Sequence, residues 1–386
     1  MTLTVPRVAA VRRSRPALPE AVRATLPLWL ASRVAVALLS LAGARVLTDI
    51  RADAVPGFRA LWYRWDVDLF TKVARFGYLS PAYPDRTEVD FPGMPIAIRL
   101  AHLLLRDWVV SGLVVSLVAG AAASAALWRL SADEVGRARA PVAVLALVLF
   151  PYAVFLFAGY SEALFLAFAT GAWLAARRQR WWPAGLLGAG AAATRLLGIP
   201  LCLALAVEYV VSRRRADLRL VDRQAPALLL PPLPVLAFAA YLHGRTGRWD
   251  AYTTAMREGW NRTQTWPWEG WRATWRAAFD GSQGSALAWF WRAELAAVVI
   301  GVVLTLVLAR AGRWGEAAFV GGSTLLMSAS SYYASGVRAV LVWFPLYLLL
   351  ARVAARRPWL LAAYAWVCGP LMAVLVVAFT RGQWVD

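Results

Sequence analysis

The chain has 386 residues, and 60% of them are hydrophobic, whereas soluble domains average about 45–50% apolar residues. Its formal net charge is +19, almost wholly from arginine, because Lys72 is the single lysine. In a soluble protein such a charge would suggest nucleic-acid binding. Here the arginines cluster in short loops between apolar runs, where they orient a membrane protein and meet anionic lipid. We therefore expect a polytopic membrane protein that contacts membrane lipids and no nucleic acid.

The signatures of several other classes are missing from the sequence. The two cysteines, Cys202 and Cys368, both fall in apolar runs, so we expect no structural disulfide. The two histidines, His102 and His243, are too few and too far apart to indicate a zinc site. No Walker loop, GxGxxG or GxSxG sequence occurs, which argues against an energy-coupled pump and against a classical hydrolase.

The first predicted span covers residues 26–47 and follows a group of arginines, Arg7, Arg12, Arg13, Arg15 and Arg23. The positive-inside rule therefore places the N-terminus in the cytoplasm. Ala42-Gly43-Ala44 resembles a signal-peptidase site, but the run is long and contains Arg33. We expect an uncleaved signal anchor, so that residues 48–107 form a first external loop.

This loop contains two carboxylates one residue apart, Asp66 and Asp68, among aromatic and basic side chains. Apolar residues recur there at helical spacing, which predicts a short amphipathic helix at the membrane surface that ends near Gly77. A carboxylate beside a bilayer could remove a proton from a hydroxyl of a lipid-bound substrate. The alternative interpretation is an interfacial anchor whose charges face water.

Ten further spans are predicted, about eleven in all, with a tryptophan-rich second external loop at residues 243–285. They cover residues 109–130, 141–158, 164–176, two short spans within 182–211, 226–242, 286–308, 317–331, 340–350 and 359–379. Residues 182–211 are too long for one span, and the arginines that follow must be cytoplasmic, so we predict a turn near Thr194-Arg195. No repeat or linker interrupts the chain, which indicates one all-α domain over residues 1–386, a polytopic transmembrane helix bundle.

This topology brings ionisable residues to the external side. They are Asp66, Asp68, Glu88, Asp90, Glu162, Arg195, Arg262 and Arg338. Ionisable groups in or beside spans are costly and tend to face a functional cavity. Carboxylates with arginines suit a substrate that has hydroxyls and a phosphate. Two simpler interpretations remain: Glu162 could stabilise a helix N-terminus beside Ser161, and the tryptophans could form an aromatic belt.

The helix from Pro183 to Ala193 would rise only about 16 Å, roughly half of the ~30 Å hydrocarbon core. Such a short hairpin needs a turn that is buried in protein or lines a wet cavity. We therefore expect Asp66 and Arg195 to share one externally open cavity.

Six motifs follow one another along the chain. They are Trp65-Asp66 with Phe70, Ala74 and Gly77-Tyr78; Phe91-Pro92-Gly93-Met94-Pro95; Tyr160-Ser161-Glu162-Ala163-Leu164-Phe165; Thr194-Arg195 with Gly198; Trp260-Asn261-Arg262 through Trp266-Pro267-Trp268; and Arg338 through Phe344-Pro345-Leu346. Together they resemble the GT-C superfamily of membrane glycosyltransferases, in particular the PIG-V family of GPI mannosyltransferases and its bacterial relatives. Leu196 stands where the family pattern has proline. Val337 and Ala339, beside Arg338, also depart from the pattern, so the resemblance does not identify the acceptor.

The resemblance implies a GT-C-like fold and an inverting hexosyltransferase, expected to be a mannosyltransferase. It would move a sugar from a polyprenyl-phosphate donor to a lipid, glycan or protein acceptor at the extracytoplasmic face of the cell membrane. The resemblance makes Asp66 the catalytic base. We expect Arg195 and Arg338 to hold the leaving phosphate. We expect the remaining substrate contacts from Asp68, Glu162, Trp260 and Arg262.

No His or carboxylate cluster has metal-ligand spacing, so we expect no dedicated metal site and no certain cofactor. The pair Asp66 and Asp68 could still hold a divalent cation loosely. A competing function is a non-enzymatic transporter or flippase of lipid-linked sugars, and a third is a scaffold subunit. Polar groups that collect near one face favour the enzyme, because a flippase needs them along a full path.

Overall fold

The computed structural model describes residues 18–46, 56–281 and 284–385. All regular elements within these ranges are helical, and the one β-type pairing there is an isolated bridge between Gln264 and Ser330. The predicted all-α class is therefore confirmed. Arg7, Arg12, Arg13 and Arg15, on which the orientation of the N-terminus was based, lie outside the described residues, as do residues 48–55 of the first predicted loop.

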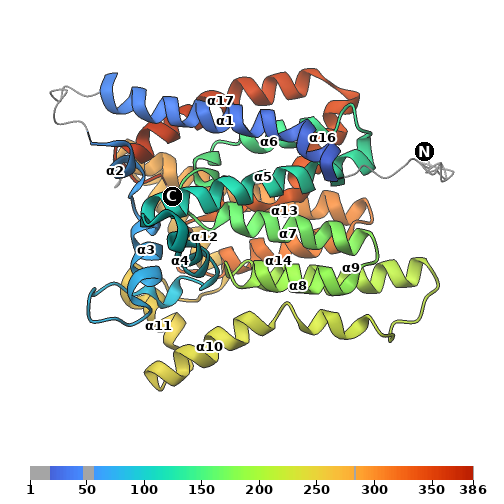
Figure 1. Ribbon diagram of the computed structural model, residues 1–386, viewed down its shortest axis with the longest axis horizontal. Helices are drawn as coiled ribbons and strands as arrows, with labels where there is room; N and C mark the ends of the chain where they lie inside the picture. The colour runs from blue at the N-terminus through green and yellow to red at the C-terminus, as the bar shows by residue number, and fades with distance from the viewer. Residues whose placement is uncertain (1–17, 47–55, 282–283, 386) are drawn as a thin grey trace.

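Most of the helices run along the long axis of the molecule (Figure 1). The longest are α1 (Leu18–Val46), α5 (Trp108–Val135), α13 (Ser285–Arg310) and α17 (Trp359–Thr380). Shorter helices run beside them: α6 (Pro141–Val148), α7 (Glu162–Arg177), α8 (Trp181–Ala192), α9 (Gly198–Arg215), α10 (Leu233–Thr246), α14 (Trp314–Ser328) and α16 (Phe344–Arg356). Helix α5 packs against α1, α4 (Gly93–Leu105), α7 and α16 and so occupies the centre of the bundle.

Five helical segments of the described residues are long and apolar enough to cross a membrane, and the bent pair of α15 (Gly336–Val342) and α16 would make six. The chain is thus a multi-pass membrane protein. The prediction of about eleven spans exceeds this count, because the other predicted spans fold as the shorter helices α6, α7, α8, α9 and α14. The predicted span at 141–158, for example, ends its α-helix at Val148 and continues through Pro151 into a 3₁₀ turn, η3 (Ala153–Leu156). Proline has no N–H to extend a helix, so apolar composition overstated the helix length there.

The predicted pair of helices within residues 182–211 is confirmed. Helix α8 ends at Ala192 and α9 begins at Gly198, so the break falls on the five residues around Thr194 and Arg195. A Cβ atom on Gly198 would lie 2.2 Å from the Cα of Ala192, so glycine allows the two helix ends to approach this closely. Thr194 is buried, as expected for a turn that protein rather than lipid must satisfy.

Short helices gather at one end of the bundle, on the left in Figure 1. They are α2 (Phe58–Trp62), α3 (Asp66–Phe76), α4 (Gly93–Leu105), α11 (Ala251–Trp260) and α12 (Pro267–Phe279), with the 3₁₀ turn η2 (Thr87–Val89). The amphipathic helix predicted in the first loop is confirmed as α3, and Gly77 is its C-cap. Helix α15 (Gly336–Val342) precedes α16 and meets it at a bend of 62°.

A buried ionic network joins helices α5, α14 and α16 elsewhere in the bundle. Arg313 contacts Glu134 at 2.9 Å and also pairs with Glu316, whose carboxylate accepts a hydrogen bond from Trp173 Nε1 at 3.2 Å. Arg352 contacts Glu134 at 2.7 Å. Because each buried charge has an opposite partner, the network fixes these helices against one another.

Candidate active site

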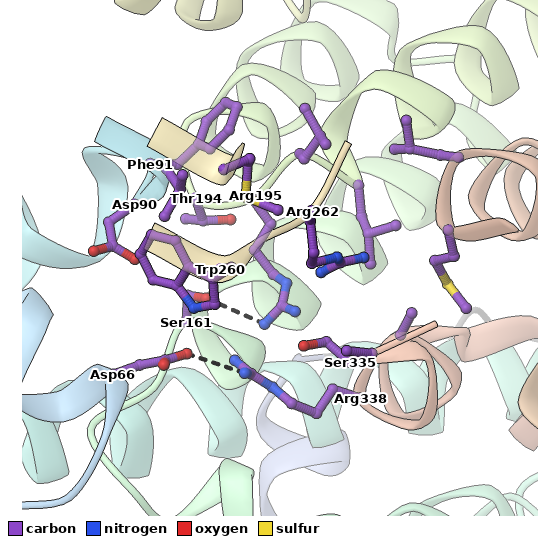
Figure 2. Close-up of a pocket in the computed structure, with 18 of the residues that line it drawn as sticks. Asp66, Asp90, Phe91, Ser161, Thr194, Arg195, Trp260, Arg262, Ser335 and Arg338 are labelled. Carbon is purple, nitrogen blue, oxygen red and sulfur yellow. Dashed lines mark hydrogen bonds and ion pairs between the residues drawn. The ribbon is translucent and has the colours of Figure 1, made fainter. Parts of the chain in front are cut away.

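A cavity of about 240 Å³ lies where α3, the α8–α9 turn, α11 and α15 meet. Figure 2 shows its polar lining, with Asp66 and Arg338 pointing toward each other and Arg195 pointing toward Ser161. Arg262 and Trp260 also line it. The structure therefore brings Asp66 and Arg195 into one cavity, as predicted from the sequence.

Four charged side chains form the centre of this site, and we call Asp66, Glu162, Arg195 and Arg338 the charge quartet. Arg338 donates from Nε to Glu162 Oε1 at 2.6 Å and from Nη1 to Asp66 Oδ2 at 3.0 Å. Arg195 pairs with the same Glu162 oxygen and donates to Ser161 Oγ at 3.2 Å. Glu162 is fully buried, whereas the Asp66 side chain is 26% exposed. The buried Glu162 thus pairs with both arginines beneath the cavity surface, whereas Asp66 can be reached from the cavity.

Glu162 does not line the cavity. Its carboxylate lies beneath the two guanidinium groups and has no surface open to a sugar in this conformation. The structure therefore gives Glu162 the geometry of a positioning residue for Arg195 and Arg338 rather than that of a direct sugar contact.

Arg338 is only 4% exposed and lies between two aromatic rings. Its guanidinium carbon is 4.9 Å from the ring centroid of Phe155 and 4.8 Å from that of Tyr160, a cation–π arrangement. The N-terminus of its helix is held by Glu294, a fully buried residue of α13 that accepts hydrogen bonds from the backbone N–H of Gly336 at 2.8 Å and of Val337 at 3.4 Å. Sequence reasoning missed Glu294, although a lone glutamate inside a long apolar run is a visible signal.

Asp66 is placed by an unusual backbone conformation. Trp65, directly before it, has φ 52° and ψ −122°, a region that L-residues with large side chains rarely adopt. The backbone N–H of Asp66 then donates to the hydroxyl of Tyr160 at 3.2 Å. Strained residues that the surrounding structure maintains are concentrated at functional sites, so this geometry supports a functional role for the Trp65–Asp66 corner.

The glycine of the FPGMP segment positions Arg195. The backbone N–H of Gly93 donates to the carbonyl oxygen of Ala193 at 2.7 Å. A Cβ atom at Gly93 would lie 2.7 Å from Cγ2 of Thr194 and 2.8 Å from that carbonyl oxygen. Only glycine therefore allows α4 to begin directly against the turn that carries Arg195.

Of the remaining predicted residues, Arg262 and Trp260 line both the first cavity and a neighbouring one. Arg262 donates from Nε to Ser330 Oγ at 3.1 Å, and the carbonyl of Trp260 accepts from the Tyr332 hydroxyl. Asp68 does not line the first cavity but an adjacent one. It pairs with Lys72 at 2.8 Å and accepts from Tyr63.

Asp90 lines the first cavity, although no role beyond an external position was predicted for it. Its side chain is 8% exposed, and Oδ2 has no hydrogen-bond partner among the described residues. Burial, and then the nearby charge of Asp66, raise the pKa of Asp90 well above its ordinary value. We infer a carboxyl group that is protonated over a wider pH range than usual.

The described residues contain no cluster of three or more His, Cys, Asp or Glu side chains that could hold a metal ion. Asp66 and Asp68 each contact a cationic side chain, Arg338 and Lys72. Because an oxygen of each carboxylate already contacts a cationic side chain, each carboxylate is a poorer ligand for a divalent cation.

The chain is similar to known proteins both in its overall fold and in part of its sequence. The structure aligns with the crystal structure of ArnT from Cupriavidus metallidurans bound to undecaprenyl phosphate, with a TM-score of 0.54 and 14% identity, over 92% of this chain and 77% of that one. This match shows that the chain has the ArnT fold.

In sequence, the chain is 35% identical over 147 residues to GPI alpha-1,6-mannosyltransferase 2 of Mus musculus, and 35% and 33% identical to the proteins of that name from Rattus norvegicus and Cricetulus griseus. The match covers 35% of this chain and 29% of the length of each relative. No protein-family model matches the chain. The chain is thus a distant homologue of GPI alpha-1,6-mannosyltransferase 2, and the resemblance to PIG-V-like GT-C proteins is confirmed.

Proposed function

We propose that this protein is a glycosyltransferase that moves a sugar, expected to be mannose, from a polyprenyl-phosphate donor to a lipid, glycan or protein acceptor at the extracytoplasmic face. The observation that carries the proposal is the charge quartet, which sets a reachable carboxylate beside two arginines in one cavity. The distant homology to a mannosyltransferase and the fold shared with ArnT, which was solved with undecaprenyl phosphate, support the donor class.

In the proposed reaction Asp66 accepts the proton of an acceptor hydroxyl. The hydroxyl oxygen forms a bond to the anomeric carbon while the bond from that carbon to the phosphate oxygen breaks. The electron pair of the broken bond remains on the phosphate, where Arg195 and Arg338 supply fixed donors for the developing charge. A single displacement of this kind inverts the configuration at the sugar carbon.

The orientation is also a proposal. We infer about eleven crossings, with the shorter helices crossing beside the long ones, a cytoplasmic N-terminus and a cavity open to the outside. Arginine-rich ends support it: Arg213, Arg214 and Arg215 end α9, and Arg310 ends α13. In Figure 1 both ends lie on the right, away from the short helices around the site. The positive-inside rule makes that end cytoplasmic.

The packing inside the bundle favours the transferase over the flippase alternative. Phe165, Phe319, Phe344 and Trp173 contact one another in series with centroid distances of 5.6 to 6.3 Å, and all four are buried. A substrate path between the leaflets would need polar groups through this region. This series of packed rings, which ends at Trp173 beside the Arg313–Glu316 pair, therefore favours a site that opens to one side.

The test is transfer of radiolabelled mannose from polyprenyl-phosphate-mannose in membranes that contain the protein. Replacing Asp66 by Asn should reduce transfer by about 10²–10⁴-fold, as expected for loss of a general base. Asp133→Asn, at an exposed position of α5 away from the cavity, is the matched control and should leave transfer unchanged. Full transfer by the Asp66 variant would refute the assigned role, and label that crosses the membrane still on its donor would indicate the flippase.

A further inference from the structure

A second cavity, of about 400 Å³, lies beside the first and has a largely aromatic wall. It is lined by Trp65, Trp260, Tyr332 and Trp384, together with Asp66, Asp68, Leu69, Arg262, Ala334 and Ser335. We call it the aromatic chamber. Asp66 appears in the lining of both cavities, as do Trp260, Arg262 and Ser335. The two cavities therefore meet at the carboxylate proposed as the base.

The indoles of Trp65 and Trp384 face solvent space rather than the core. They are 46% and 58% exposed, and their ring centroids lie 6.2 Å apart. Trp62, the last residue of α2 and three residues before Trp65, is by contrast completely buried. The chain changes direction between Trp62 and Trp65, where Trp65 has its positive φ. The strained backbone described above is thus associated with a large apolar ring in the chamber wall.

Trp384 belongs to the segment that follows α17, and local contacts hold this segment in place. The backbone N–H of Gln383 donates to the carbonyl of Ala378 at 2.9 Å, and that of Gly382 donates to Phe379 at 2.9 Å. The Trp384 ring also packs at 5.9 Å from Phe290, and Val385 beyond it is buried. The chamber wall is thus formed jointly by the first loop, α11 and the segment after α17.

The chemistry of the two cavities differs. The first has two arginines of the charge quartet, which suit a phosphate. The aromatic chamber has neither of these arginines; its flat rings lie beside the carboxylates of Asp66 and Asp68, which accept hydrogen bonds from hydroxyl groups, and beside Arg262, which lines both cavities. Flat rings beside a few hydrogen-bonding groups are the lining that orients a neutral ligand with both apolar and hydroxyl faces. A pyranose has both kinds of face, and the chamber volume falls within the usual range for small-molecule sites, about 300–1,000 Å³.

We propose that the aromatic chamber binds a carbohydrate acceptor, a mono- or disaccharide unit, and directs one hydroxyl to Asp66 while the first cavity receives the donor phosphate. This assignment rests on the proposed transferase function, and it narrows the acceptor to a molecule whose reacting end is a sugar.

Binding without transfer provides the first test. Methyl α-mannoside and an α-linked mannobiose are added to the purified protein in nanodiscs, and binding is followed by saturation-transfer NMR. Trp384→Ala should weaken sugar binding by roughly 3- to 10-fold, the amount expected for one aromatic contact. Trp384→Phe, which keeps an aromatic face, should restore most of it. Trp359→Ala is the matched control, because Trp359 is 63% exposed at the opposite end of α17 and lines neither cavity.

The second measurement separates acceptor from donor. In the transfer assay, Trp384→Ala should raise the KM of the sugar acceptor by a similar factor, with no change in the KM of polyprenyl-phosphate-mannose. Equal effects on both substrates, or equal sugar binding by the Ala variants at 384 and 359, would overturn the assignment. If the wild-type protein transfers label to lipid but binds neither glycoside, the chamber proposal fails and the transferase stands. If it binds the glycosides through Trp384 but transfers no mannose, the chamber stands and the proposed reaction fails.

Discussion

Replacing Glu162 by Gln should have two opposite effects: it should lower the stability of the folded protein and strengthen the binding of an anion at the charge quartet. The substitution keeps the size of the side chain but removes the negative charge that both arginines share. Arg338, at 4% exposure, would retain only Asp66 as an ionic partner within the quartet. Breaking a buried pair in this way costs about 3–5 kcal/mol, a large part of a typical stability of about 5–15 kcal/mol.

The same change should make the site a better receptor for phosphate. The quartet would go from two positive and two negative charges to two positive and one negative, so an anionic ligand supplies the missing charge. A polyprenyl phosphate at 100 times its dissociation constant stabilises a folded protein by about 2.7 kcal/mol. We therefore expect the lipid to recover most of the stability that Glu162→Gln loses, and to raise the Tm of the variant more than that of the wild type.

The assay is thermal unfolding in detergent with and without a short-chain polyprenyl phosphate. Glu316→Gln is the matched control, because Glu316 is equally buried and pairs with Arg313 outside the cavity. It should lose comparable stability, and the lipid should not restore it. Wild-type stability for the Glu162 variant, or equal recovery of both variants, would refute the reasoning.

Two further changes test other parts of the site. Because the pKa of Asp90 is raised by burial and by Asp66, its stabilising contribution is complete below its ordinary value of 3.8 and is lost as pH rises through the raised value. Asp90→Asn should therefore be more stable than the wild type at higher pH, by about 1.4 kcal/mol for each pH unit by which the folded pKa exceeds the ordinary one. The measurement is Tm as a function of pH for both proteins, and curves that stay parallel would contradict the prediction. Gly93→Ala forces a Cβ against the α8–α9 turn and should cost about 1–3 kcal/mol and most transfer. Gly244→Ala, where a Cβ meets nothing within 4 Å, should keep wild-type transfer, and the Gly93 assignment fails if both variants do.

Parts of the site could be predicted because each depends on a local constraint visible in the sequence. The α8–α9 turn follows from a run of residues too long for one span, with arginines beyond it, and this predicted Arg195 at the external end. The amphipathic spacing around Asp66 likewise predicted α3 and its end at Gly77. These signals belong to short stretches, so no tertiary information was needed to interpret them.

Other parts depend on contacts between distant segments and could not be predicted. Glu162 and Arg338 are 176 residues apart, and nothing local indicates that the Glu162 carboxylate would pair with two arginines from distant helices. Trp384 joins the chamber only because the segment after α17 folds back toward Trp65. The lengths of the helices within several predicted spans were likewise not visible locally: α6, for example, ends at Val148 within the span predicted at 141–158.

The placement of Arg338 between Asp66 and Glu162 has a consequence for the electrical balance of the proposed turnover. When Asp66 takes up the acceptor proton it becomes neutral, and in the same step the departing phosphate gains one negative charge. Arg338 can exchange its contact with Asp66 for one with the phosphate through the same Nη1 atom, so the summed charge inside the cavity does not change. No counter-ion then has to enter or leave as the sugar moves. The chemical step should therefore depend little on bulk ionic strength and on the voltage across the membrane.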